Sequence, residues 1–84
     1  MPNNESHKKR LRQSRARRLR NRQVRSEIRT MTKRLLATES RERATVELSE
    51  LYRVLDRATR RNVIKANTAA RQKARAARHV RDLT

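Results

Sequence analysis

The sequence contains no glycine, and its single proline stands at position 2. Glycine and proline are the residues that most often end or bend a helix, so nothing of that kind interrupts the chain from Asn3 to Thr84. Apolar residues recur along this stretch at the spacing of one helical face. The sequence therefore predicts an all-α fold, in which the turns are marked only by weaker signals.

Three helices are predicted, near residues 5–37, 41–60 and 63–82. The apolar face of the first comprises Val24, Ile28, Met31 and Leu35, and that of the second Ala44, Leu48, Leu51, Leu55 and Ala58, broadened by Tyr52 and Val54. The third has a shallower predicted face of Val63, Ala66, Ala70, Ala74, Ala77 and Val80. Thr38-Glu39-Ser40 supplies candidate N-caps for the second helix, and Asn62 tolerates the left-handed conformation that often ends one. We expect a three-helix bundle.

Charge is distributed unevenly along the chain. The net charge is +17, of which residues 1–36 carry +11, residues 37–60 carry zero and residues 61–84 carry +6. The apolar face of the first helix begins only at Val24, so residues 1–23 are predicted to extend beyond the bundle as a basic helix. We expect one domain over residues 1–84, with this basic extension (residues 1–23) and a bundle from about residue 24 to residue 84.

So large a positive charge on a small chain favours a polyanionic partner, above all a nucleic acid. On a helix the basic residues of the extension spread around the whole circumference, which suits a helix enclosed by several RNA backbones. The alternative is a disordered tail that binds nucleic acid loosely, and a segment that becomes ordered on binding lies between the two. In the third helix, Arg71, Arg75 and Arg78 lie within about 60° of arc, with Asn67 beside them. This second arrangement suits a helix that bridges phosphates from one side.

Several classes of protein are excluded or disfavoured. The chain has no cysteine, and His7 and His79 stand far apart, so we expect no enzyme, no metal site and no cofactor. The longest wholly apolar run is three residues, and residues 1–5 are polar, so we expect neither a membrane span nor a secretory leader. Tyr52 is the one aromatic residue, and its place on an apolar face argues against base stacking. The carboxylates Glu47, Glu50 and Asp56 are expected to offset arginines of their own helix, namely Arg43, Arg53, Arg57 and Arg60.

Two blocks of the sequence resemble a bacterial ribosomal protein family, that of small-subunit protein number twenty. The weaker block contains Asn3, Ser6, Lys8-Lys9-Arg10, Arg17-Arg18, Asn21, Ser26, Arg29-Thr30 and Lys33. The more specific block runs from Ile64 to Arg75 and resembles the family pattern I-H-x-N-x-A-A-R-x-K-S-R. Lys65 replaces the usual histidine, Arg61-Asn62 replaces the usual Lys-Gly, and Thr38-Glu39-Ser40 lacks the glycine common in the first turn.

The resemblance implies a three-helix bundle with a long first helix that binds small-subunit (16S) ribosomal RNA directly and early in assembly. It also implies contacts with the 5′ domain and the long penultimate RNA helix, as a monomer on the cytoplasmic ribosome. The candidate RNA-binding residues are Asn3, Ser6, Lys8, Lys9, Arg10, Arg17, Arg18, Asn21, Arg29, Thr30, Lys33, Lys65, Asn67, Arg71, Lys73, Arg75 and Arg78. Recognition is expected to rest on phosphate contacts and RNA shape.

Two other functions remain open from the residues alone. A basic region followed by an apolar stripe is also typical of a basic-zipper or nucleoid-type DNA-binding protein, although two heptads are short for a zipper. A membrane-active cationic peptide would need a stronger apolar face than residues 1–23 offer.

Overall fold

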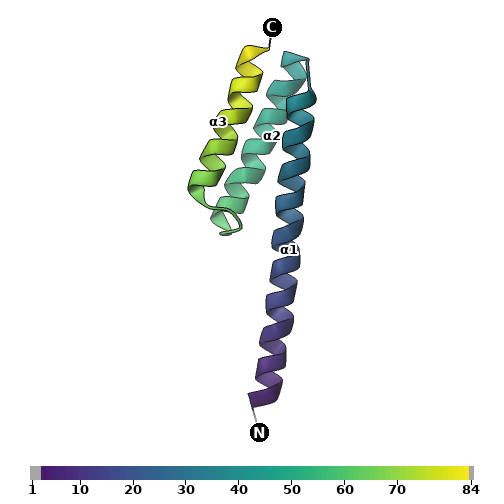
Figure 1. The fold of residues 1–84 in the computed structure, drawn as a ribbon, viewed down its shortest axis with the longest axis vertical. Helices are drawn as coiled ribbons and strands as arrows, with labels where there is room; N and C mark the ends of the chain where they lie inside the picture. The colour runs from purple at the N-terminus through teal and green to yellow at the C-terminus, as the bar shows by residue number, and fades with distance from the viewer. Residues whose placement is uncertain (1–2, 84) are drawn as a thin grey trace.

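The computed structural model describes residues 3–83, and for Asn3 the backbone alone. Its three helices are α1 (Asn3–Ala37), α2 (Arg41–Arg60) and α3 (Ala66–Asp82). Figure 1 shows α2 between the other two, with the amino-terminal part of α1 continuing alone beyond them. The overall dimensions are 67 × 20 × 13 Å. The predicted all-α bundle with a long first helix is confirmed.

The core lies where the apolar faces of the three helices meet. Its side chains come from every helix: Ile28, Leu35, Ala44, Leu51, Leu55, Ala58, Ala69, Ala76 and Val80. Val24 and Met31 pack against them from α1, and Leu48 and Val54 from α2. The apolar faces predicted for the first two helices are therefore correct. All of these core residues lie at or beyond position 24, so residues 3–23 contribute nothing to the core.

The predicted apolar face of the third helix is correct for Val63 and Val80, which contribute to the core, but wrong for three of its alanines. Ala66, Ala70 and Ala74 are exposed, whereas Ala69 is 4% and Ala76 1% exposed. Alanines occupy positions on several sides of this helix, so periodicity does not decide which side is buried. Packing against α2 selects the side that also presents Val80, which is 7% exposed.

Both turns use the polar residues that the sequence offers. Ser40 is the N-cap of α2, and its hydroxyl accepts a hydrogen bond from the Arg43 N–H at 3.4 Å. At the other end of α2, Asn62 has φ 59°. The N–H of Asn62 bonds to the Thr59 carbonyl and that of Val63 to the Ala58 carbonyl, the pattern of a Schellman cap. The predicted role of Asn62 is confirmed.

This cap explains why α3 begins at Ala66 and not near residue 63. Val63 is part of the cap, and its side chain packs against the core, as does that of Ile64. Lys65 is then the N-cap of α3, with extended backbone and no hydrogen bond from its side chain, and its carbonyl accepts from the Ala69 N–H at 3.0 Å.

Candidate nucleic-acid interface

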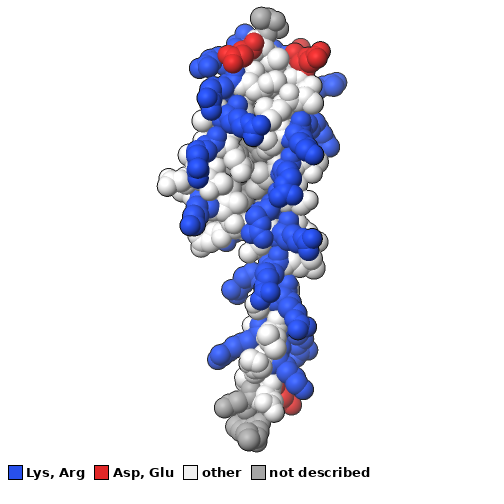
Figure 2. Space-filling model, in the orientation of Figure 1, with Lys and Arg blue, Asp and Glu red and all other residues white. Residues whose placement is uncertain are grey.

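The basic extension is a solvated helix with cations on every side. Its candidate residues Ser6, Lys8, Lys9, Arg10, Arg17 and Arg18 are all exposed. Figure 2 shows blue basic side chains along both edges of this helix, below the bundle. Asn21 lies half-buried where the extension meets the bundle, and the side chain of Asn3 lies outside the described part of the chain. Such a helix is open to contact from several directions at once.

The extension meets the turn between α2 and α3 at a hollow of about 480 Å³. The hollow is lined by Arg17, Arg20, Asn21, Val24, Arg61, Asn62 and Val63. No carboxylate is among these residues, and three of them are arginines. The fold therefore adds Arg20, Arg61 and Asn62 to the basic surface that the sequence predicted around Arg17 and Asn21.

Within the bundle, α1 presents a line of cations to α3. Arg25, Arg29 and Lys33 follow one another at four-residue intervals and are exposed on one side of the helix. Thr30, also predicted as a site residue, lies on another side of α1. It is exposed there, its hydroxyl donates to the Ser26 carbonyl at 3.0 Å, and it lines a separate hollow with Glu27 and Arg34. The structure therefore does not bring Thr30 together with Arg29 and Lys33.

The predicted basic side of α3 is exposed as expected. Arg71, Arg75 and Arg78, here called the arginine stripe, are exposed, as is Asn67. Lys65 is also exposed, immediately before the helix begins. The stripe lies roughly opposite the buried Ala69, Ala76 and Val80, because these positions differ from it by about half a helical turn.

Lys73 is the exception among the α3 candidates, because it is turned towards α2. Its ammonium pairs with the Asp56 carboxylate and lies 5.2 Å from the centre of the Tyr52 ring. The Tyr52 hydroxyl in turn donates to the Lys73 carbonyl at 3.4 Å. The side chain of Lys73 is 29% exposed, so it joins two helices of the bundle and is separated from the arginine stripe.

Few of the basic groups are neutralised within the chain. Over residues 3–83 the ion pairs are Lys73–Asp56 and Arg81–Asp82, the second at 3.5 Å. Neither includes an arginine of α2, so Glu47, Glu50 and Asp56 form no direct ion pair with the arginines whose charge they were expected to offset. Glu47 instead accepts a hydrogen bond from the Thr38 hydroxyl, 2.9 Å away. The basic extension and the arginine stripe thus have no acidic partner in the described part of the chain.

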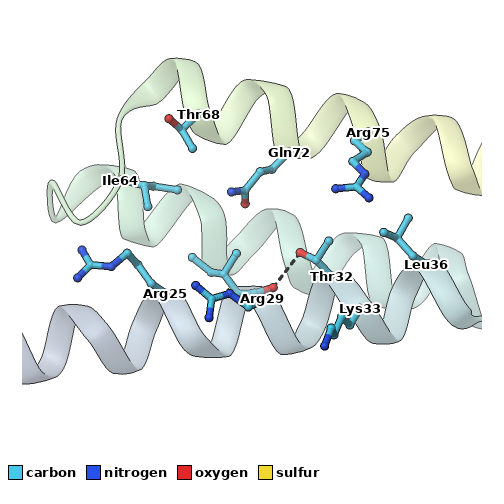
Figure 3. A pocket seen from close by; sticks show the side chains of 10 residues that line it. Arg25, Arg29, Thr32, Lys33, Leu36, Ile64, Thr68, Gln72 and Arg75 are labelled. Atoms are coloured by element: carbon cyan, nitrogen blue, oxygen red, sulfur yellow. Dashed lines mark hydrogen bonds between the residues drawn. The ribbon is translucent and has the colours of Figure 1, made fainter.

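A groove separates α1 from α3 and joins two of the predicted basic regions (Figure 3). We call it the α1–α3 groove; it has a volume of about 480 Å³ and is lined by Arg25, Ile28, Arg29, Thr32, Lys33, Leu36, Ile64, Thr68, Gln72 and Arg75. Figure 3 shows Gln72 and Arg75 extending from α3 towards α1. Sequence reasoning found Arg29, Lys33 and Arg75 but missed Arg25, Thr68 and Gln72. The four-residue spacing of Arg25 and Arg29 could have indicated the first of these.

The histidines do not form a metal site with other residues of the described chain. The Nε2 atom of His79 lies 3.1 Å from the Thr38 carbonyl oxygen, so this ring joins α3 to the end of α1. Among residues 3–83 there is no cluster of three histidine, aspartate or glutamate side chains that could hold a metal ion. The helices described here also include none that is long and apolar enough to span a membrane.

Comparison with known proteins gives one consistent result. The pattern of the family described as ribosomal protein S20 matches residues 2–81. The chain is 40% identical to the small ribosomal subunit protein bS20 of Fusobacterium nucleatum, over 99% of this chain and 96% of that protein. It is 43% identical to bS20 of Kosmotoga olearia, over 89% of this chain and 81% of the relative, and 36% identical to bS20c of Phaeodactylum tricornutum, over 92% and 94%.

Proposed function

The chain belongs to the ribosomal protein S20 family, and we propose that it acts by binding small-subunit (16S) ribosomal RNA directly and holding RNA helices together as the subunit assembles. Membership makes it a structural component of the ribosome and not an enzyme. The proposal concerns the finer point of how this component contacts RNA. The proposed target is the 5′ domain together with the long penultimate RNA helix, as the resemblance implies. The chain binds there as a single copy.

The observation that carries the proposal is the large number of exposed cations without acidic partners on two separate helices. The two regions differ in geometry, because the basic extension has cations on every side and the arginine stripe has them on one. A helix charged all round fits between several phosphate backbones, whereas a one-sided stripe fits across a groove or between two RNA helices. Guanidinium groups favour this role because their planar donors match phosphate oxygens.

The basic-zipper alternative conflicts with the structure, because the apolar stripe of α1 is packed inside the bundle. A zipper needs Val24, Ile28, Met31 and Leu35 as a seam for a second copy. Here Ile28 is 4% exposed and Leu35 is fully buried within the same chain. The seam is therefore already occupied by α2 and α3. A nucleoid-type DNA-binding protein would not need that seam. A comparison of the affinities for RNA and for DNA is therefore needed to distinguish this alternative from the ribosomal function.

The test compares binding of the full chain to 16S ribosomal RNA and to duplex DNA across a series of salt concentrations. One variant carries Arg71→Gln, Arg75→Gln and Arg78→Gln. A matched control carries Arg43→Gln, Arg53→Gln and Arg57→Gln on the exposed side of α2, with the same change in net charge. We expect the stripe variant to lose affinity for the RNA and to reduce the slope of log affinity against log salt by roughly two to three, since each phosphate contact contributes about 0.7–0.9.

The control should change the slope by less than one. Equal losses in the two variants would show that net charge alone governs binding and would contradict the proposed interface. Tighter binding to the DNA duplex than to the RNA at moderate salt would favour the nucleoid-type alternative.

A further inference from the structure

The α1–α3 groove combines features that a phosphate contact alone does not need. Its floor is apolar, formed by Ile28, Leu36 and Ile64, and Ile28 is only 4% exposed. Polar but uncharged groups of Thr68 and Gln72 stand on the α3 side. A volume of about 480 Å³ lies within the range of small-ligand sites. An occupant of this groove must therefore have an apolar part as well as a charged one.

The rim of the groove fixes the sign of that charge. Arg25, Arg29 and Lys33 stand along α1, about 6 Å apart along its axis, and Arg75 faces them from α3. No carboxylate lines the groove. Cations on both walls favour an anion that extends along the groove, as a nucleic-acid strand does.

Gln72 adds a hydrogen-bonding requirement inside the groove. Its side-chain oxygen is buried and has no hydrogen-bond partner among the described residues. A buried acceptor without a partner is destabilising, so a donor that reaches it gains a corresponding advantage. Figure 3 shows the Gln72 side chain extending from α3 into the space between the two helices, and the last torsion of a glutamine side chain is soft. The Watson–Crick edge of every nucleobase carries at least one N–H donor.

We infer that the α1–α3 groove holds one unpaired nucleotide of the ribosomal RNA, an inference that rests on the proposed function. The base lies on the floor of Ile28, Leu36 and Ile64, with its edge towards Gln72 and Thr68. The phosphates on either side of it lie against the basic rim. Guanidinium planes and aliphatic side chains supply the contact with the base face that aromatic residues supply in other RNA-binding proteins.

This arrangement gives the chain one contact with a base, in addition to its contacts with the backbone. A paired nucleotide does not fit, because its base edge is already occupied and its faces are stacked. The groove therefore selects an RNA position at which a base is splayed out of its helix.

The experiment probes complexes of the full chain with 16S ribosomal RNA using hydroxyl radicals, which report backbone contacts, and base-specific reagents, which report exposed base edges. One variant carries Gln72→Leu and Thr68→Val, which remove the polar groups while keeping similar volume. A second, Thr68→Phe, fills the groove. The control carries Thr45→Val and Ser49→Ala on the exposed side of α2. Circular dichroism checks that each variant folds.

We expect the wild type and the control to protect at least one unpaired base. Both groove variants should restore the reactivity of that base, keep the backbone protections elsewhere, and bind about ten-fold more weakly. Base reactivities that are the same in the wild-type and both variant complexes would overturn the inference, and so would changes confined to the backbone, which would mean that the groove holds only phosphate. Absence of any RNA protection by the wild type would instead overturn the proposed function, and the inference with it.

Discussion

The Tyr52 hydroxyl donates to the backbone carbonyl oxygen of Lys73, 3.4 Å away, while the Lys73 ammonium lies 5.2 Å from the centre of the Tyr52 ring. This reciprocal contact joins α2 to α3, and Asp56 completes it by pairing with the same ammonium. A lysine that the sequence predicted to bind RNA thus holds two helices together. Neighbouring residues of α3 therefore have different roles: Lys73 contacts α2, whereas Arg71 is exposed on the side predicted to bind RNA.

Substitution of Lys73 should affect stability more than that of its neighbour Arg71. We expect Lys73→Met to lower the free energy of unfolding by about 0.5–1 kcal/mol, since the ion pair is partly open to water and the contact with the Tyr52 ring is modest. Arg71→Met, at an exposed position, should change it by less than about 0.5 kcal/mol. Urea denaturation measures both values. RNA affinity should show the opposite order, and a larger loss of affinity in Lys73→Met would contradict this division of roles.

The buried side of α3 can be tested with two alanines. Ala76 is 1% exposed, whereas Ala74 is exposed. Ala76→Leu forces a larger side chain into the core and should destabilise the bundle by about 1–3 kcal/mol. Ala74→Leu should change stability by less than about 0.5 kcal/mol. Thermal unfolding compares the two directly, and an equal effect would mean that α3 is rotated relative to the arrangement described here.

The left-handed conformation of Asn62 predicts an unequal response to two small substitutions. At φ 59° a glycine has no steric penalty, so Asn62→Gly should leave the free energy of unfolding unchanged or raise it slightly. Asn62→Ala should lower it by about 1–2 kcal/mol, because alanine keeps the unfavourable Cβ atom but lacks the polar side chain through which asparagine tolerates this conformation. Denaturant titration provides the measurement, with Thr59→Ala as a reference substitution nearby. Equal stability of the alanine and glycine variants would contradict the assigned turn.

Removal of residues 1–23 should separate folding from binding. Of the residues that the structure describes, none before Val24 belongs to the core, so we expect the shortened chain to unfold within about 4 °C of the full chain. Its affinity for 16S ribosomal RNA should fall by orders of magnitude and become less sensitive to salt, because most basic residues of α1 are lost. A shortened chain that fails to fold would show that the bundle depends on the extension.

Much of the architecture could be predicted because it depends on local properties. The apolar spacing of Val24 to Leu35 and of Ala44 to Ala58 indicates one side of a helix without ambiguity, and both sides are buried as expected. Ser40 and Asn62 occupy turns because their own side chains suit those backbone conformations. The charge pattern likewise identified the exposed arginine stripe, since no acidic residue is interleaved with these arginines and the one carboxylate of α3, Asp82, pairs with Arg81.

The parts that could not be predicted depend on which helices meet. Sequence analysis placed the wrong alanines in the core, because an alanine-rich helix offers several sides of similar hydrophobicity. It treated Lys73 as equivalent to Arg71, because the nearness of Asp56 and Tyr52 arises only when α3 packs on α2. The α1–α3 groove was also missed, since Arg25 and Gln72 are 47 positions apart in the chain.

The sequence by itself determined that the chain is helical, because glycine is absent and proline is confined to position 2, and that residues 3–23 project from the bundle, because they lack an apolar side. It also determined the basic character of both ends. The tertiary structure alone decided which side of α3 is buried, the contact of Lys73 with α2, and the α1–α3 groove with its apolar floor and basic walls. These features depend on the packing of distant helices, whereas helicity, capping and charge depend on residues within a few turns of one another.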